Sequence, residues 1–311
     1  MALPVIALVG PTAAGKTALS IRLAYALGGP EKVEIVSADA MQLYRGMDIG
    51  TAKITAEERK NITHHQIDVI DISQAASVAA YQKHGRDNIA QIHAAGKIPL
   101  VVGGSGLYVS ALLDELNFPG TDPRIRSELE DIAETRGLEP LIAELFDKDP
   151  VSARTINLAN PRRVIRALEV VRLTGKSYTP VFPRHTSHYP NTIHLGVRTE
   201  RNELDRRIAA RAQNMFDTGL IDETRALLDQ GLRESPTAHK ATGYAQAIDV
   251  IDHKINVAQA VDAVAFHTRR LAKKQRTWFR PDPRVSWIDI EPQHLEHATD
   301  QALNVIEHAR G

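Results

Sequence analysis

The sequence predicts an α/β fold in which a doubly wound parallel sheet carries helices on both faces and is interrupted by an all-helical insertion. Short apolar runs alternate with helical patterns in the first third of the chain and again toward its end. Between these parts lies a stretch that has helical spacing only. Alternation of strand and helix is typical of a parallel sheet, because each parallel connection has to cross over the sheet.

The predicted strands are short apolar runs, and the predicted helices repeat their apolar residues with helical periodicity. Strands are expected at residues 5–9, 33–37, 98–102, 193–197 and 285–290. Helices of the core are expected at residues 16–27, 78–95, 201–231 and 257–279.

The strand signals stop after Phe118-Pro119-Gly120. From about residue 122 to residue 174 every segment has the spacing of a helix, and residues 178–190, with three prolines, read as a linker that returns to the core. We therefore expect a catalytic core made of residues 1–115 and 191–311, with a helical insertion domain at residues 116–190.

Composition excludes several classes of protein. The 311 residues carry a net charge of +0, so nucleic-acid binding would have to come from local clusters of Lys and Arg. The absence of cysteine excludes disulfides, thiolate zinc sites and thiol catalysis. The first apolar run ends at a glycine loop and reads as a strand, and no run approaches the ~18 apolar residues of a membrane span. We expect a cytoplasmic protein.

The stretch GPTAAGKT follows the first predicted strand and opens the first predicted helix. It matches the phosphate-loop pattern G-x-x-x-x-G-K-[ST] in full, in the context of a P-loop NTPase-like core. Its backbone N–H groups and the helix N-terminus form an anion site, Lys16 adds a charge for the terminal phosphates, and the Thr17 hydroxyl is a ligand for Mg²⁺. The predicted loop residues are Gly10, Pro11, Thr12, Ala13, Ala14, Gly15, Lys16 and Thr17. The motif identifies a phosphate and not the molecule that carries it.

A nucleoside triphosphatase also needs an acid at the end of an apolar strand. The strand IPLVV ends in Gly103-Gly104-Ser105-Gly106 without an acid, whereas the strand EIVSAD ends in Asp39. By position, Asp39 is either a metal-associated acid or a catalytic base. No guanine-reading motif is present, so GTP is not expected.

Five segments together resemble the tRNA dimethylallyltransferases. They are GPTAAGKT, SADAMQLYRGMDIGTAK, HHQIDVID, PLVVGGSGLY and AKKQRTWFR, in family order and at family-like spacing over almost the whole chain. The resemblance implies transfer of a dimethylallyl group from dimethylallyl diphosphate to N6 of adenosine 37, in tRNAs that read codons starting with U. The products are N6-(dimethylallyl)adenosine and diphosphate.

The resemblance also implies roles for single residues. The loop then holds a diphosphate that is the leaving group, with Lys16 and Mg²⁺ stabilising its charge. Asp39 is the base that takes the N6 proton. Ser105 stands where the family usually has threonine, and its hydroxyl would bond the diphosphate or the aspartate. Arg225 matches a family arginine that binds the diphosphate.

Several basic stretches are expected to bind the anticodon stem-loop of the tRNA. In PRRVIR three arginines share one side of a helix, and the helix near residue 275 interleaves cations with Trp278 and Phe279. Ala40 and Met41 stand where many relatives have Ser and Arg. The predicted tRNA-binding residues are Asp39, Ala40, Met41, Gln42, Ser105, Arg126, Arg162, Arg163, Arg166, Lys240, Gly243, Lys273, Lys274, Gln275 and Arg276.

Three other functions remain open. One is a dimethylallyltransferase that acts on free adenine nucleotides, which needs no tRNA clamp. Another is an ATP-dependent small-molecule kinase, and the third is a non-catalytic RNA-binding protein. The sequence carries no clear oligomer signal, and we expect a monomer.

Overall fold

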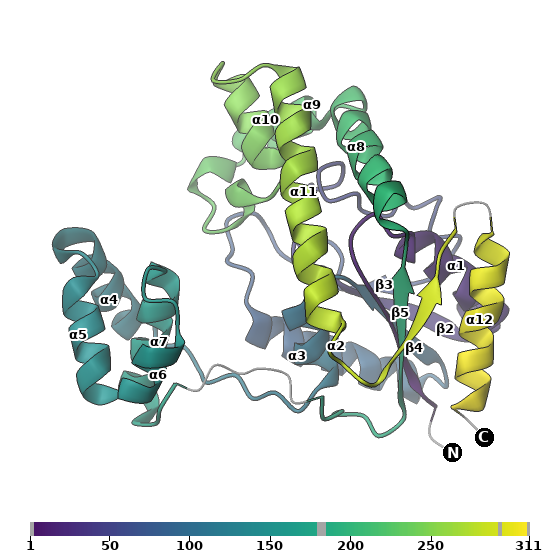
Figure 1. Cartoon of the computed structure of the whole chain (residues 1–311), viewed down its shortest axis with the longest axis horizontal. Helices are drawn as coiled ribbons and strands as arrows, with labels where there is room; N and C mark the ends of the chain where they lie inside the picture. The colour runs from purple at the N-terminus through teal and green to yellow at the C-terminus, as the bar shows by residue number, and fades with distance from the viewer. Residues whose placement is uncertain (1–2, 179–184, 292–293, 310–311) are drawn as a thin grey trace. The chain divides into compact units, whose positions relative to one another are not determined.

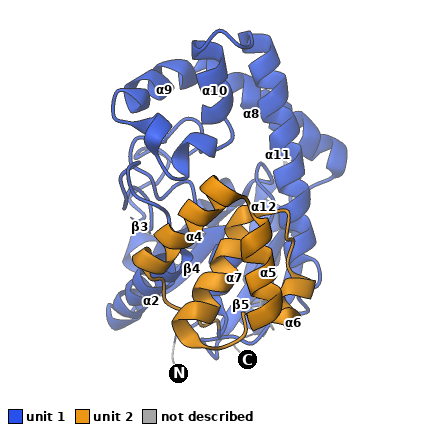
Figure 2. Ribbon diagram, turned by 90° about the vertical axis from the view of Figure 1, so that its left-hand side faces the viewer, with its two compact units in different colours: residues 1–115, 185–311 blue, residues 116–184 orange. Residues whose placement is uncertain are grey.

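The computed structural model describes residues 3–178, 185–291 and 294–309. It divides into two compact units, shown in different colours in Figure 2. Unit 1 comprises Met1–Glu115 and His185–Gly311, and unit 2 comprises Leu116–Arg184. The sequence places the return to the core at residue 191. The structure places it at His185, because the Glu115 N–H donates to Thr186 O (3.0 Å) and the His188 N–H donates to Leu113 O (2.7 Å).

Unit 1 is built on a six-stranded sheet with the order β3-β2-β4-β1-β5-β6 (Figure 1). All of its pairs are parallel, as the sequence predicts. The strands are β1 (Val5–Val9), β2 (Val33–Ala38), β3 (His64–His65), β4 (Ile98–Gly103), β5 (Thr192–Arg198) and β6 (Val285–Asp289). Five of them are predicted strands, and β3 is an unpredicted two-residue edge strand.

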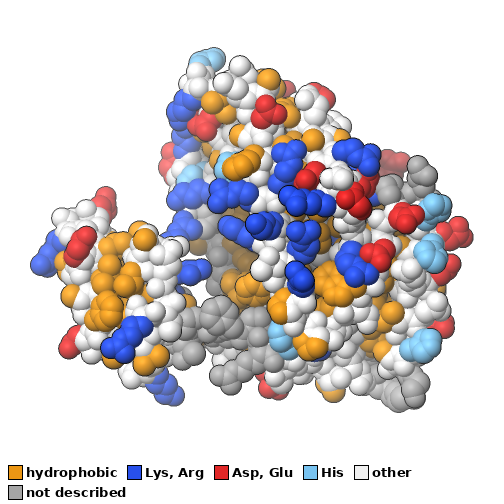
Figure 3. Space-filling model, in the orientation of Figure 1, with side chains coloured by type: hydrophobic (Ala, Val, Ile, Leu, Met, Phe, Trp, Pro, Cys, Tyr) orange, Lys and Arg blue, Asp and Glu red, His pale blue; other side chains and the backbone are white. Residues whose placement is uncertain are grey.

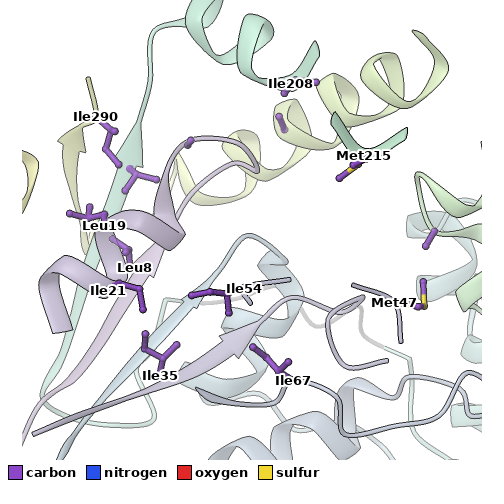
Figure 4. Close-up of a cluster of buried hydrophobic side chains, with 14 of the residues drawn as sticks. Leu8, Leu19, Ile21, Ile35, Met47, Ile54, Ile67, Ile208, Met215 and Ile290 are labelled. Carbon is purple, nitrogen blue, oxygen red and sulfur yellow. The ribbon is translucent and has the colours of Figure 1, made fainter. Parts of the chain in front are cut away.

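Successive side chains of β1 enter two different cores, which places helices on both faces of the sheet. Ile6 and Leu8 belong to a cluster that includes side chains of α1 (Lys16–Ala26) and α12 (Leu295–His308), part of which Figure 4 shows. Val5, Ala7 and Val9 belong to a second cluster with α2 (Val78–Ala94) and α3 (Gly106–Leu113). The doubly wound α/β fold is confirmed.

The second half of unit 1 adds four longer helices. They are α8 (Arg201–Asp217), α9 (Leu220–Leu228), α10 (Tyr244–Ile251) and α11 (Val257–Phe279). The single helix predicted for residues 201–231 is wrong. It breaks at Gly219, whose φ of 103° is left-handed and ends one helix before the next begins. Short 3₁₀ turns lie at Gly29–Glu31, Leu232–Glu234 and Ala238–Lys240.

Unit 2 is all helical in its described part. Its helices are α4 (Pro123–Arg136), α5 (Glu139–Lys148), α6 (Pro150–Thr155) and α7 (Pro161–Thr174). They enclose a core of their own that includes Leu129, Leu141, Leu145, Val164 and Leu168. The predicted linker at residues 178–190 lies partly outside the described residues. Across the described part of both units, the helices lack the length and apolar character that a membrane crossing requires.

Candidate active site

The phosphate loop joins the carboxyl end of β1 to the N-terminus of α1. Gly10 (φ 149°) passes close to β5, where a Cβ would lie 2.9 Å from the Val197 carbonyl oxygen. Gly15 (φ 93°) has the left-handed conformation at the start of α1. At both positions glycine allows a backbone conformation that other residues rarely adopt. The loop lies at the N-terminus of α1, where backbone N–H groups favour an anion, and anion binding there stays a prediction.

Lys16 lies folded against its own loop. Its Nζ donates to Gly10 O (3.0 Å) and Pro11 O (2.7 Å). Burial lowers the pKa of Lys16 to about 8, the nearby charge of Asp39 opposes that shift, and Arg211 adds to it. An anion that binds in the loop would stabilise the charged form of Lys16.

Two pockets meet at this loop. A polar pocket of about 310 Å³ is lined by Lys16, Thr17 and the turn Gly103-Gly104, among others. A smaller pocket of about 120 Å³ is lined mainly by apolar residues such as Met41, Met215 and Val264. The pockets share Thr12, Asp39, Thr51 and Arg211. The arrangement accommodates a molecule with an anionic end and a short apolar end.

A larger and more open depression of about 920 Å³ lies at the ends of β5 and β6. Its lining has more carboxylates than arginines, and both of its arginines are paired with carboxylates. Arg198 pairs with Asp289 (2.8 Å), Arg206 with Glu203 (2.5 Å) and His294 with Glu291 (2.9 Å). We place the functional site at the phosphate loop, where burial and positive charge coincide.

Asp39 directly follows β2 and lines both pockets. Its Oδ1 accepts a hydrogen bond from the Met41 N–H (3.0 Å). The carboxylate thus lies at the junction between the polar and apolar pockets, a position that suits a base.

Ser105 caps the start of α3 beside this turn. Its Oγ accepts from the Ala40 N–H (3.3 Å), and its N–H donates to Ala38 O (3.3 Å). The hydroxyl therefore supports the backbone next to Asp39. The predicted bond to the aspartate itself is not formed.

Arg211 of α8 is a site residue that sequence reasoning missed. Its Nη1 donates to Thr12 Oγ1 (3.2 Å) and its Nη2 to Thr51 O (3.2 Å), whereas its buried Nε has no partner among the described residues. Burial lowers the pKa of the guanidinium, and Asp39 opposes this. In the sequence this arginine is one of several on an amphipathic helix, and nothing in the spacing distinguishes it.

Arg225 of α9 lies elsewhere. Its side chain is 61% exposed, pairs with Asp222 (2.8 Å) and lines neither pocket at the loop. The structure does not bring Arg225 to the phosphate loop, whereas Arg211 and Arg207 contact loop residues, and the diphosphate role of Arg225 stays a prediction.

The basic helix α11 separates its predicted RNA-binding residues into two groups. Lys273, Lys274 and Arg276 are exposed, and Figure 3 shows Lys and Arg side chains gathered over this part of unit 1. Gln275 is 6% exposed, and its Oε1 accepts from the Thr12 N–H (2.8 Å). Gln275 therefore faces the phosphate loop, unlike its exposed neighbours Lys274 and Arg276.

The arginines predicted in unit 2 also divide. Arg162 and Arg163 are exposed on α7. Arg126 and Arg166 instead bind the buried carboxylate of Glu169, with closest distances of 2.5 Å and 2.6 Å. Although burial alone raises the pKa of Glu169, the hydrogen bonds from the two arginines hold it below its ordinary value. These two cations have a structural partner that the sequence did not reveal.

The remaining predicted contacts lie around the pockets. Met41 lines the apolar pocket and Gln42 the polar one. Ala40 is half-buried and Lys240 is exposed. Gly243 (φ 101°) is buried, and a Cβ there would lie 3.5 Å from Gly50 Cα, so the residue serves close packing.

Known proteins are similar to this chain over nearly its whole length. A sequence model of the IPP transferase family matches residues 42–282. A tRNA dimethylallyltransferase of Thermobifida fusca is 48% identical and covers 98% of this chain and 95% of its own. One from Streptomyces coelicolor is 50% identical, covering 97% and 96%.

Solved structures also resemble this chain over nearly its whole length. The full-length tRNA isopentenylpyrophosphate transferase of Bacillus halodurans has a TM-score of 0.70 at 39% identity and covers 99% of this chain and 98% of its own. A eukaryotic dimethylallyltransferase acting on tRNA has a TM-score of 0.82 at 25% identity, covering 97% and 77%. The chain belongs to the IPP transferase family.

Proposed function

We propose that the protein transfers a dimethylallyl group from dimethylallyl diphosphate to N6 of adenosine 37 of tRNA. The observation that carries this proposal is the meeting of a cationic polar pocket and a small apolar pocket at Asp39. The relatives named above act on tRNA or are named for this transfer. The diphosphate occupies the loop and the five-carbon group the apolar pocket.

The diphosphate is the leaving group. Breaking the allylic C–O bond places negative charge on it, and Lys16, Arg211 and the loop amides stabilise that charge as it develops. Lys16 leaves the carbonyls of Gly10 and Pro11 for the diphosphate. Burial of both cations strengthens the interaction, because little water screens it.

Asp39 accepts the proton that N6 loses as the new C–N bond forms. An exocyclic adenine amine is a weak nucleophile because its lone pair is delocalised into the ring, so a positioned base contributes about 10²–10⁴-fold. The adenine reaches Asp39 only when it is unstacked from the anticodon loop.

Mg²⁺ is the proposed cofactor. The oxygen donors here, the Thr17 hydroxyl with diphosphate oxygens and water, suit a hard cation that keeps part of its hydration shell. Among the described residues, no group of three or more His, Asp or Glu side chains is placed to hold a metal. The ion would therefore arrive with the diphosphate, and it would neutralise charge on the leaving group.

The tRNA binds through its anticodon stem-loop. The exposed cations Lys273, Lys274 and Arg276 of α11 and Arg162 and Arg163 of α7 are the proposed phosphate contacts. We propose that the reaction takes place in the cytoplasm and that the enzyme is a monomer.

A transfer assay tests the proposal. Purified protein is incubated with labelled dimethylallyl diphosphate, Mg²⁺ and either undermodified tRNA or AMP, and label is expected in tRNA only. Label in AMP alone would indicate a nucleotide prenyltransferase. No label together with ATP consumption would indicate a kinase, and RNA binding without either reaction a non-catalytic protein.

Asp39→Asn tests the base. The amide keeps an acceptor for the Met41 N–H, so the turn is expected to hold, while kcat falls by about 10²–10⁴-fold. The matched control is Asp217→Asn at an exposed position of α8. Single-turnover transfer and tRNA binding are measured in parallel, and undiminished transfer by Asp39→Asn contradicts the assignment.

A further inference from the structure

Gln275 lies among cations that face solvent but points the other way. It sits between Lys274 and Arg276 on α11, and both of these neighbours are exposed. Successive residues of an α-helix project about 100° apart, so the residue between two exposed ones can face inward. Gln275 does so and is 6% exposed.

The amide of Gln275 reaches the phosphate loop. Its Oε1 accepts from the Thr12 N–H at 2.8 Å, and Thr12 Oγ1 accepts from Arg211 at 3.2 Å. One loop residue is thus held from α11 through its backbone and from α8 through its side chain. This fixes the loop relative to the buried arginine.

The other end of the amide lies beside Gly104, which also lines the polar pocket. Gln275 lines this pocket together with Lys16 and Arg211. A Cβ on Gly104 would lie 2.6 Å from Gln275 Nε2 and 2.8 Å from Gly10 O, so the glycine leaves the room that the amide needs. Thr12 is the hydrogen-bond partner of Oε1, whereas Nε2 lies beside Gly104 of the pocket lining and is the end of the amide that can donate to an anion.

We propose that Gln275 is a positioning residue of the diphosphate site: its Oε1 fixes Thr12 of the loop and its Nε2 donates to the bound diphosphate. This assignment rests on the proposed function and replaces the RNA contact expected from the sequence. It makes α11 bifunctional, with cations outward for RNA and one amide inward for the leaving group.

Two substitutions separate the two ends of the amide. Gln275→Met keeps the length of the side chain and removes both the acceptor and the donor. Gln275→Glu keeps an acceptor for Thr12, but it removes the donor and adds a negative charge beside the diphosphate. The probe is dimethylallyl thiodiphosphate, an unreactive analogue, and its Kd is measured with Mg²⁺ and without RNA.

We expect the analogue to bind about tenfold more weakly to Gln275→Met, the size of effect expected for a lost buried hydrogen bond, and more weakly still to Gln275→Glu. The Kd for tRNA is expected to stay within about twofold in both variants. Lys274→Gln is the matched control. It is expected to weaken tRNA binding and to leave the Kd for the analogue unchanged. Thermal unfolding verifies that each variant is folded.

Each result decides the proposal. If Gln275→Glu binds the analogue like the wild type, Nε2 does not serve the diphosphate. If the variants lose tRNA binding instead, Gln275 belongs to the RNA surface. In either case the wild type still binds the analogue and modifies tRNA, so the proposed function stands. Failure of the wild type to bind the analogue would reject both proposals.

Discussion

At the scale of single residues, Arg211 and Arg225 form a natural comparison. Arg211 is enclosed beside Thr12, whereas Arg225 is exposed and paired with Asp222. Charge that acts on a leaving group has to be close to it and shielded from water. We therefore expect the diphosphate interaction to depend on the first arginine only.

Arg211→Gln is expected to lower kcat/KM for dimethylallyl diphosphate by about 10²-fold or more, since one preorganised donor to a developing anion is worth about that much. Arg225→Gln is the control and is expected to stay within about twofold. Steady-state kinetics at saturating tRNA measures both. A large loss in Arg225→Gln with none in Arg211→Gln would reverse the assignment.

At the scale of elements, α7 carries arginines of two kinds. Arg163 is exposed, whereas Arg166 donates to Glu169 Oε2 (2.6 Å) and to the carbonyls of Pro119 (2.6 Å) and Gly120 (3.1 Å). Arg166 thus ties the helix to the segment that precedes α4. Its charge is already balanced by a buried carboxylate.

Arg166→Ala is expected to lower the free energy of unfolding by about 2 kcal/mol, because it leaves Glu169 with one arginine fewer in a buried site. Arg163→Ala is expected to leave stability within about 0.5 kcal/mol and to reduce the salt slope of tRNA binding by about 1. Denaturation and salt titrations measure the two effects. Loss of RNA affinity without loss of stability in Arg166→Ala would return that residue to the RNA surface.

The limits of sequence reasoning also appear at this scale. The bounds of α11 agree with the predicted 257–279, because its apolar residues repeat with helical periodicity and Asn256 caps its start. The loop and Asp39 were predicted because a local motif and a strand end mark them. Gln275 and Arg211 were misplaced or missed, because their roles depend on contacts with Thr12, more than 190 positions away in the chain.

At the scale of the whole molecule, each unit encloses its own core, and the sheet of unit 1 holds an unusual buried histidine. His194 of β5 is 5% exposed, and its Nε2 has no partner among the described residues. It pairs in register with Ala7 on one side and Val285 on the other. Burial lowers the pKa of His194 to about 4, with Arg284 acting in the same direction and Asp282 and Asp114 opposing.

This histidine makes the stability of unit 1 depend on pH. Between the ordinary value of 6.5 and about 4, the unfolded chain binds a proton at His194 that the folded chain does not, so folding becomes less favourable as the pH falls. The contribution of His194 to the free energy of unfolding is complete above pH 6.5 and is lost by about pH 4, a difference of about 3 kcal/mol.

His194→Gln is expected to flatten the fall in the free energy of unfolding over this range, measured by denaturant titration at several pH values. His84→Gln, at an exposed position of α2, is expected to keep the wild-type profile. Equal profiles for all three proteins would mean that His194 takes up its proton at the same pH in the folded and unfolded states, so that burial does not lower its pKa.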